Sequence, residues 1–251
     1  MSKPIVSLVN VEKWYGTNHV VKNMNINIAE GEFLTLLGPS GCGKTTTLRM
    51  ISGFELPTSG VIKVQGESVE KKEPYQRDVN TVFQNYALFP HMNVYDNIAF
   101  GLKIKKMSKD VIDQKVLRML KLIGLEGFEN KNVTTLSGGQ QQRVWIAMAL
   151  AQKTSYLLLD EPTTYLDIRY QLELLRLLKE INQKYKITII MVLHDINQAI
   201  QYSDNIIAIK KGRIIVEGKS NEVITSEVIR EIYGIDLKMT QLSKQPYVFT
   251  V

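Results

Sequence analysis

A glycine-rich stretch near the amino end carries residue types that bind phosphate. It fits the pattern G-x-x-x-x-G-K-S/T, whose last two positions are Lys44 and Thr45. Glycines let successive backbone N–H groups converge on phosphate oxygens, and a lysine can reach the terminal phosphates. The hydroxyl of Thr45 is the expected magnesium ligand. The residues expected to bind the nucleotide in this stretch are Gly38, Pro39, Ser40, Gly41, Cys42, Gly43, Lys44, Thr45 and Thr46.

Two adjacent carboxylates follow an apolar run later in the chain. The run Tyr156–Leu159 predicts a buried strand, and Asp160 and Glu161 stand at its end. Asp160 is expected to hold Mg²⁺ opposite Thr45. Glu161 is expected to accept a proton from an attacking water, which is general-base catalysis. Phosphate-binding glycines and this acid pair together indicate hydrolysis of a nucleoside triphosphate.

Two further polar residues follow apolar runs that predict strands. His194 closes Ile187–Leu193, so we expect it at the sheet edge where α/β folds bind ligands, in contact with the γ-phosphate. Gln84 follows Val79–Phe83, and its neutral amide is able to touch Mg²⁺ or water. The candidate catalytic residues are therefore Glu161, His194 and Lys44, and the candidate metal ligands are Thr45, Gln84 and Asp160.

These residues need a sheet and helices to hold them. Alternating apolar residues in Ile5–Val11 and Met24–Ile28 predict an antiparallel layer at the start of the chain. Phe33–Leu37 predicts a buried strand directly before the phosphate-binding loop. A helix from about Gly43 to Ser52 and a strand near Val61–Gln65 follow. The pattern is typical of an α/β protein.

The middle of the chain has a different pattern. Between Val94 and Ala151 the strand signals vanish and the apolar spacing becomes helical, so we expect a helical subdomain at about residues 85–152. Strand-like runs then return on both sides of a helix expected from about Ile168 to Tyr185, and Lys210–Arg213 predicts a hairpin turn. We therefore expect an α/β fold of the P-loop NTPase class, with a mostly parallel sheet core, an N-terminal antiparallel β layer and a helical insertion.

Composition narrows the function classes. The chain has 251 residues, 44% of them apolar and 22% charged, as in ordinary globular proteins. Apolar stretches such as Ile187–Leu193 stop at about seven residues, whereas a membrane span needs roughly 18, and Met1–Asn10 lacks a secretory core. We therefore expect a cytoplasmic location. The single cysteine, Cys42, excludes an internal disulfide framework. The net charge of +6 is spread without long clusters, so no nucleic-acid partner is expected.

The segment Leu136–Arg143, Leu-Ser-Gly-Gly-Gln-Gln-Gln-Arg, completes the set of motifs. Together with the motifs above it resembles the signature of the ABC ATPase family, and the resemblance covers nearly the whole chain. It implies a single ABC-type ATP-binding domain over residues 1–251, with ATP and Mg²⁺ as cofactors. It also implies that Tyr15 stacks on adenine and that Gln84 senses both Mg²⁺ and the membrane partner.

The same resemblance implies that the active form is an ATP-dependent dimer of the chain. Residues at the start of a predicted helix would reach the γ-phosphate of the ATP bound by the other protomer, and Asp167 would join the protomers nearby. Exposed N–H groups and the positive end of a helix dipole are consistent with that contact. The residues concerned are Ser137, Gly138, Gly139 and Gln140. The resemblance further implies integral-membrane permease subunits as partners, which would hold the chain peripherally at the cytoplasmic face of the inner (plasma) membrane.

Segments of the chain resemble two different subgroups of the family. One subgroup is the spermidine/putrescine importer ATPases, and the stretches similar to it are 79–92, 97–103 and 127–143. The other is the iron-siderophore importer ATPases, and the stretches similar to it are 143–152, 161–168 and 191–199. We hypothesise a hybrid, natural or constructed, joined at Ser137–Arg143 and with or without a cognate permease. The cargo, polyamine or iron-siderophore, stays open.

Two other function classes share parts of this pattern. A GTPase or small-molecule kinase would use the phosphate-binding loop and Asp160, but the guanine-reading pattern N-K-x-D is absent and Leu136–Gln140 would be unexplained. An ABC ATPase acting on nucleic acid is the other class. Its repair types interpose long coiled coils, whereas only 52 residues separate Gln84 from Ser137. The expected function is therefore the ATP-hydrolysing subunit of an ABC importer.

Overall fold

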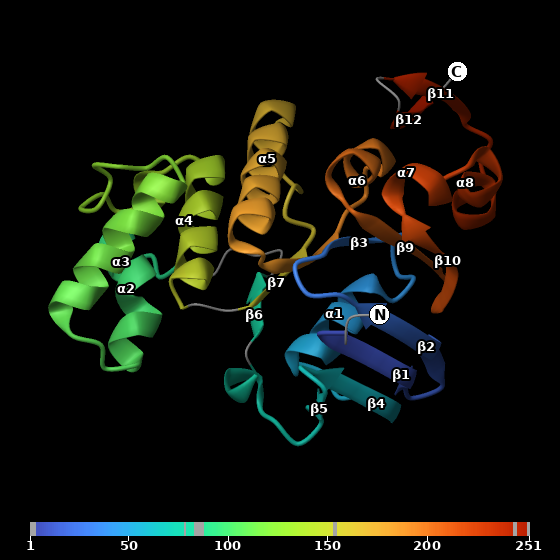
Figure 1. The fold of residues 1–251 in the computed structure, drawn as a ribbon, viewed down its shortest axis with the longest axis horizontal. Coiled ribbons are helices and arrows are strands. Elements are labelled where there is room, and N and C mark those ends of the chain that lie inside the picture. Colours follow the sequence, from blue (N-terminus) through green and yellow to red (C-terminus); the bar gives the residue numbers. More distant parts are fainter. Residues whose placement is uncertain (1–3, 78, 83–87, 153–154, 243–244, 250–251) are drawn as a thin grey trace.

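The computed structural model describes residues 4–77, 79–82, 88–152, 155–242 and 245–249. Figure 1 shows the arrangement of its elements. The strands are β1 (Val6–Tyr15), β2 (Asn18–Ile28), β3 (Phe33–Leu37), β4 (Ser59–Val64), β5 (Glu67–Ser68), β6 (Val79–Val82), β7 (Tyr156–Asp160), β8 (Thr188–Val192), β9 (Asn205–Lys210), β10 (Arg213–Lys219), β11 (Lys238–Leu242) and β12 (Gln245–Phe249). The α-helices are α1 (Lys44–Ser52), α2 (Val94–Ile104), α3 (Lys109–Leu122), α4 (Gly138–Ala151), α5 (Ile168–Tyr185), α6 (Ile196–Tyr202), α7 (Ser220–Val223) and α8 (Ser226–Tyr233).

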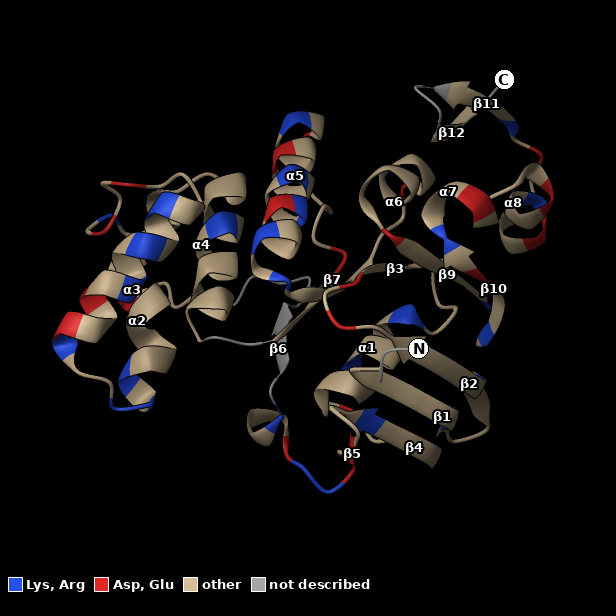
Figure 2. Cartoon of the chain, in the orientation of Figure 1, with Lys and Arg blue, Asp and Glu red and all other residues tan. Residues whose placement is uncertain are grey.

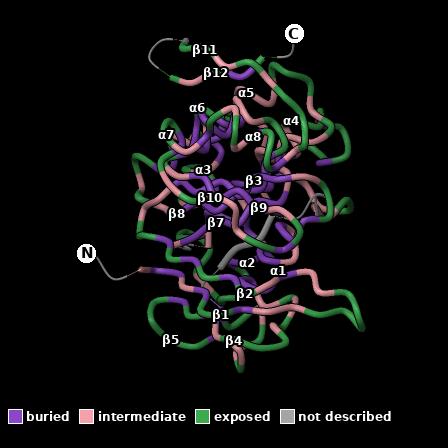
Figure 3. The backbone as a smooth tube through the Cα atoms, turned by 90° about the vertical axis from the view of Figure 1, so that its right-hand side faces the viewer, coloured by how far each residue is buried: buried purple, intermediate pink, exposed green. Residues whose placement is uncertain are grey.

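The central sheet has the strand order β10-β9-β3-β8-β7-β6, and only β10 pairs antiparallel to its neighbour. Strands β3, β7, β8 and β9 are buried along most of their length and mainly apolar on both faces. Leu34 and Leu36 of β3 pack towards the N-terminal β layer, whereas Phe33 and Leu37 pack towards the helices on the other side. Such burial explains the continuous apolar runs in the sequence. The prediction of a mostly parallel, covered sheet is confirmed, and Figure 3 shows β3, β7, β8 and β9 as largely buried chain.

The N-terminal layer is a second sheet, with the order β2-β1-β4-β5. Its first two strands are longer than predicted, since β1 continues to Tyr15 and β2 begins at Asn18. The register between them shifts three times between Leu8 and Trp14. Bulges of this kind interrupt the alternation of inward and outward side chains, so the pattern of period two ends before the strand does. The layer therefore reaches as far as the aromatic pair Trp14 and Tyr15.

Three helices, α2, α3 and α4, fill the middle of the chain and lie to one side of the sheet (Figure 1). They share an apolar cluster of their own, which includes Ile98, Leu120 and Val144. The prediction that helices replace strands between Val94 and Ala151 is confirmed. In the part of the chain that the structure describes, every helix is too short or too polar to cross a membrane.

The last part of the chain holds elements that the sequence did not reveal. Helices α7 and α8 lead to the hairpin β11–β12, which packs beside α6 (Figure 1). The side-chain amide of Asn197 in α6 makes two hydrogen bonds to the backbone of Val248. Its nitrogen donates to the Val248 carbonyl and its oxygen accepts from the Val248 N–H, both at 2.8 Å. The Asn197 amide thus pairs with the backbone N–H and C=O of Val248, as a neighbouring strand would. Such pairing depends on residues far apart in sequence, so local patterns do not predict it.

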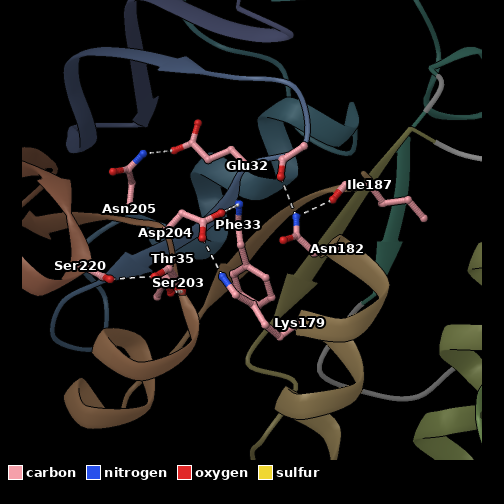
Figure 4. Close-up of polar contacts among 11 residues, drawn as sticks. Glu32, Phe33, Thr35, Lys179, Asn182, Ile187, Ser203, Asp204, Asn205 and Ser220 are labelled. Atoms are coloured by element: carbon pink, nitrogen blue, oxygen red, sulfur yellow. Dashed lines mark hydrogen bonds and ion pairs between the residues drawn. The ribbon is translucent and has the colours of Figure 1, made fainter. Parts of the chain in front are cut away.

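Polar side chains connect the amino-terminal ends of the parallel strands (Figure 4). Asp204 accepts a hydrogen bond from the Phe33 N–H at 2.9 Å and pairs with Lys179 at 2.6 Å. Asn182, which is 4% exposed, donates to the carbonyls of Gly31 at 2.8 Å and Ile187 at 2.9 Å. These bonds join the turn before β3 to the turn before β8. The edge opposite the phosphate-binding loop is therefore held by side chains as well as by strand pairing.

Replacing Asn182 by alanine is expected to lower the free energy of unfolding by about 1–3 kcal/mol, because two part-buried carbonyls lose their donor. Urea unfolding followed by circular dichroism measures this change. Gln183→Ala is the matched control, since Gln183 is the exposed neighbour on the same helix. Equal stability of the Asn182→Ala variant and the parent chain would contradict the assigned role of this amide.

Candidate functional site

The loop between β3 and α1 has the backbone shape that its glycines permit. Gly38, Gly41 and Gly43 have φ values of 147°, 74° and 107°, a region that residues with side chains rarely adopt. At Gly38 the space is closed as well, because a Cβ atom would lie 2.1 Å from the carbonyl oxygen of Ile209. Gly43 is also the N-cap of α1. The loop therefore presents backbone N–H groups beside a helix N-terminus, an arrangement that binds anions.

Lys44 is folded back onto the loop that precedes it. The residue is only 5% exposed, and its Nζ donates to the carbonyls of Gly38 at 2.7 Å and Pro39 at 2.9 Å. The ammonium group is thus held beside the loop by neutral acceptors that an anion can replace. Burial raises the pKa of the neighbouring Cys42 thiol, against the effect of Lys44, so the thiol stays protonated. Cys42 therefore contributes its backbone and its volume to this site.

Thr45 and Asp160 meet across the first turn of α1 and the end of β7. Thr45 Oγ1 donates to Asp160 Oδ1 at 2.9 Å. Burial raises the pKa of Asp160, while the Thr45 hydrogen bond lowers it and the nearby Glu161 charge raises it further. A buried carboxylate next to a hydroxyl offers the hard oxygen ligands that Mg²⁺ prefers, and a cation there would offset the cost of burial. The two residues fit a magnesium site.

Glu161 and His194 are in direct contact. His194 Nε2 lies 2.6 Å from Glu161 Oε1, and the hydroxyl of Thr164 lies 3.4 Å from Glu161 Oε2. Glu161 has a left-handed backbone, with φ at 51°, directly after the strand ends. The sequence placed both residues at the same edge of the sheet but did not predict their pairing. A carboxylate that holds an imidazole is an arrangement suited to proton transfer.

A cavity of about 340 Å³ lies beside the phosphate-binding loop. Its lining is Tyr15, Asn18, Val20, Ser40, Gly41, Gly43, Lys44, Thr45, Thr46 and Glu161. Tyr15 is part of it and Trp14 is not, because the Trp14 ring is stacked on His19 with 3.8 Å between the ring centroids. Asn18 and Val20 were missed from the sequence. The pairing of Tyr15 with Asn18 in the β1–β2 register brings Asn18 there, and a hairpin between the two is the signal that would have found it.

The signature segment lies elsewhere, at the start of α4. Ser137 caps this helix, with its side chain accepting from the Gln140 N–H at 3.3 Å and the Gln140 side chain accepting from the Ser137 N–H at 3.1 Å. A Cβ atom at Gly139 would lie 2.9 Å from the Tyr170 ring, whereas Gly138 is open. None of these residues lines the 340 Å³ cavity. The structure therefore separates the signature segment from the phosphate-binding loop of the same chain.

Asp167 and Gln84 are the other two predicted site residues. Asp167 is the N-cap of α5 and accepts from the Tyr170 N–H at 3.1 Å, at the start of the same helix that contacts Gly139. Gln84 lies outside the described residues.

Comparison with known proteins places these motifs in a family. Residues 21–164 match the protein family described as ABC transporter. The chain is 51% identical over 223 residues to the spermidine/putrescine import ATP-binding protein PotA of Clostridioides difficile (strain 630), a match that covers 89% of this chain and 64% of that protein. A second protein of that name, from Clostridium acetobutylicum, is 50% identical over 219 residues, or 87% of this chain and 62% of the relative. The chain thus spans less than two thirds of these relatives.

The fold is also similar to solved structures of ABC transporter ATP-binding proteins. The fold is similar to cbiO1 from Clostridium perfringens, described as part of the ABC transporter complex cbiONQ, with a TM-score of 0.83, 33% identity and coverage of 88% of this chain and 90% of that one. It is also similar to the ATP-binding cassette MJ0796, solved as a dimer in a post-hydrolysis state with ADP and Pi. That match has a TM-score of 0.77, 36% identity and coverage of 86% of this chain and 98% of the other.

These matches do not support the hybrid hypothesis. A match of 223 residues in a chain of 251 must cross Ser137–Arg143, the stretch at which the two halves were expected to join. One type of relative thus covers both sides of that stretch at 51% identity.

Proposed function

Because the chain belongs to the ABC transporter family, we propose that it binds ATP with Mg²⁺ and hydrolyses the ATP to ADP and phosphate. The observation that carries the proposal is the arrangement around the end of β7. There Asp160 contacts Thr45 of the phosphate-binding loop, and the next residue, Glu161, contacts His194. The residues proposed for a cation site, a phosphate site and an acid–base pair thus adjoin one cavity. Cleavage of the terminal phosphoanhydride bond of ATP by water would use these three components.

Binding would use the loop and the buried cation. The backbone N–H groups of Gly38–Thr45 would surround the phosphates, and Lys44 would exchange the carbonyls of Gly38 and Pro39 for phosphate oxygens. Thr45 and Asp160 would hold Mg²⁺, with Gln84 as a further ligand. The metal, when bound, neutralises charge on the phosphates.

Hydrolysis would use Glu161 and His194, which lie beside the proposed phosphate site. Glu161 would accept a proton from the attacking water, which its position in the cavity lining allows. His194, held by Glu161 at 2.6 Å, would donate a hydrogen bond to the γ-phosphate. Placing both groups on one edge of the sheet fixes their orientation before the reaction, and such preorganisation is a large source of catalysis.

We also propose that two copies form the complete site. Ser137 and Gly138 are exposed at the N-terminus of α4 and lie away from the cavity of their own chain. With Gly139 and Gln140 they would contact the γ-phosphate held by the other copy, and Asp167 would lie near the join. The dimeric form of the similar cassette with ADP and Pi supports this arrangement.

The partner in the membrane would be an import permease for polyamines. Relatives at 50–51% identity are described as spermidine/putrescine import ATP-binding proteins. We place the permease contact on the helical subdomain, about residues 85–152 of a single domain spanning 1–251. The chain would then lie peripherally at the cytoplasmic face of the membrane. An iron-siderophore cargo is not supported by these relatives.

Transport measurements test the proposed cargo. We expect the chain, expressed with polyamine permease subunits in bacteria that lack their own polyamine-importer ATPase, to restore energy-dependent uptake of labelled spermidine. The Glu161→Gln variant is the inactive control, and iron-siderophore permease subunits are the specificity control. Uptake of siderophore without uptake of spermidine would overturn the proposed cargo and leave the proposed ATP chemistry standing.

A further inference from the structure

The Tyr15 ring has a cation on it. Lys13 Nζ lies 4.7 Å from the centroid of the Tyr15 ring. Both residues lie at the end of β1, where the register with β2 shifts between Lys13 and Trp14, and there the Lys13 side chain reaches the Tyr15 ring. An aromatic face attracts a cation through its quadrupole, and the contact restrains the ring. A ring has two faces, and Lys13 occupies one of them.

Lys13 is itself held in place. Its Nζ pairs with Glu55 at 2.9 Å and donates to the carbonyl of Leu56 at 2.8 Å, and its side chain is only 12% exposed. The hydrogen bond from Lys13 lowers the pKa of Glu55 most, with the Lys13 charge and the Tyr15 hydroxyl acting in the same direction. Lys13 therefore joins the ring to the segment after α1.

The segment after α1 is also hydrogen-bonded to β1 through the backbone and the side chain of Thr58. The Thr58 N–H donates to the Glu12 carbonyl at 2.8 Å, and Thr58 Oγ1 accepts from the Trp14 N–H at 2.9 Å. The Glu55 N–H donates to the Arg49 carbonyl in the last turn of α1 at 3.1 Å. Since α1 begins at the phosphate-binding loop, one helix connects that loop to the support of the Tyr15 ring.

Trp14, the residue next to Tyr15, is not placed to stack on a base in this cavity. Its ring is stacked on His19 at 3.8 Å between centroids with 13° between the ring planes, and His19 Nε2 lies 2.5 Å from a Glu12 carboxylate oxygen. Trp14 is thus engaged outside the cavity that Tyr15 lines.

We infer that Lys13 and Glu55 are positioning residues that fix the Tyr15 ring in the cavity that it shares with the phosphate-binding loop. The inference rests on the proposed function, in which Tyr15 stacks on the base. Lys13 covers one face of the ring, and the base takes the other. A second group of acidic and basic residues lies on the loop after β5, where Figure 2 shows both colours.

The test compares ATP with inorganic triphosphate, which carries phosphates but no base. In Lys13→Met and Glu55→Gln we expect the affinity for ATP to fall roughly three- to tenfold, since a restraint of the cation–π class is lost. Affinity for inorganic triphosphate, which has no base, is expected to stay within twofold of the parent. KM for ATP should rise by the same factor as the dissociation constant, with kcat unchanged, and Lys13→Arg should restore most of the affinity.

The matched control is another ion pair of the N-terminal part, Lys72 and Glu67, which lie 2.6 Å apart on the surface. Lys72→Met and Glu67→Gln should leave both affinities unchanged. Equal losses for ATP and triphosphate in the Lys13 or Glu55 variants would show a general structural role and overturn the inference, as would no loss for either ligand. If the parent chain bound neither ligand, the proposed function itself would fail.

Discussion

Replacing Glu161 by glutamine is expected to lower ATP hydrolysis roughly 10²- to 10⁴-fold, the usual contribution of a general base. Glutamine keeps the volume of the side chain, and its amide oxygen can still accept a hydrogen bond from His194, 2.6 Å away in the parent. ATP binding should therefore persist. Since hydrolysis no longer separates the two copies, an ATP-bound dimer is expected to accumulate. Phosphate release measures the rate, and sedimentation velocity with and without ATP measures the dimer.

Glu180→Gln is the matched control, because Glu180 is exposed on α5 and removed from the cavity lining. It should hydrolyse ATP at the parental rate and show no additional dimer. Hydrolysis by Glu161→Gln at the parental rate would exclude Glu161 as the base. A loss of hydrolysis without a dimer would leave the base in place and contradict the two-copy site.

Replacing Lys44 by alanine is expected to weaken ATP binding by roughly 100-fold or more, because charge-assisted hydrogen bonds to the phosphates are lost. Isothermal titration calorimetry with ATP and Mg²⁺ measures the affinity. The variant also removes the donor to Gly38 and Pro39, so circular dichroism should verify that the fold is retained. Lys63→Ala, at an exposed position on β4, is the charge-matched control. Parental affinity in Lys44→Ala would contradict the proposed phosphate site.

The sequence revealed those elements whose signals are local. The buried strand β3 and the long helix α5 have the predicted bounds, because an uninterrupted apolar run and a stripe of leucines depend only on near neighbours. Strands β1 and β2 were predicted too short because bulges break their alternation. The C-terminal hairpin was missed because its support, Asn197, lies about fifty residues away in the chain.

In the candidate site, too, the features that depend on local sequence were predicted and the contacts between distant segments were not. The glycine loop and the strand-end position of Asp160 follow from spacing, and the expected opposition of Thr45 and Asp160 agrees with their 2.9 Å contact. The contact between Glu161 and His194 and the support of Tyr15 by Lys13 and Glu55 join separate segments. Only three-dimensional packing decides such partners, so the sequence gives the residue types without their pairing.

Gly139 lies so close to the Tyr170 ring that a Cβ atom at position 139 would be 2.9 Å from it. This contact restricts the order in which the two positions can be substituted during evolution. A side chain at position 139 collides with the ring as long as Tyr170 is present. Loss of the ring first would remove this collision, so the cost in packing of a larger residue at position 139 depends on whether Tyr170 is still present. As far as packing is concerned, the order of the two substitutions matters, and the history of one position limits what the other can become.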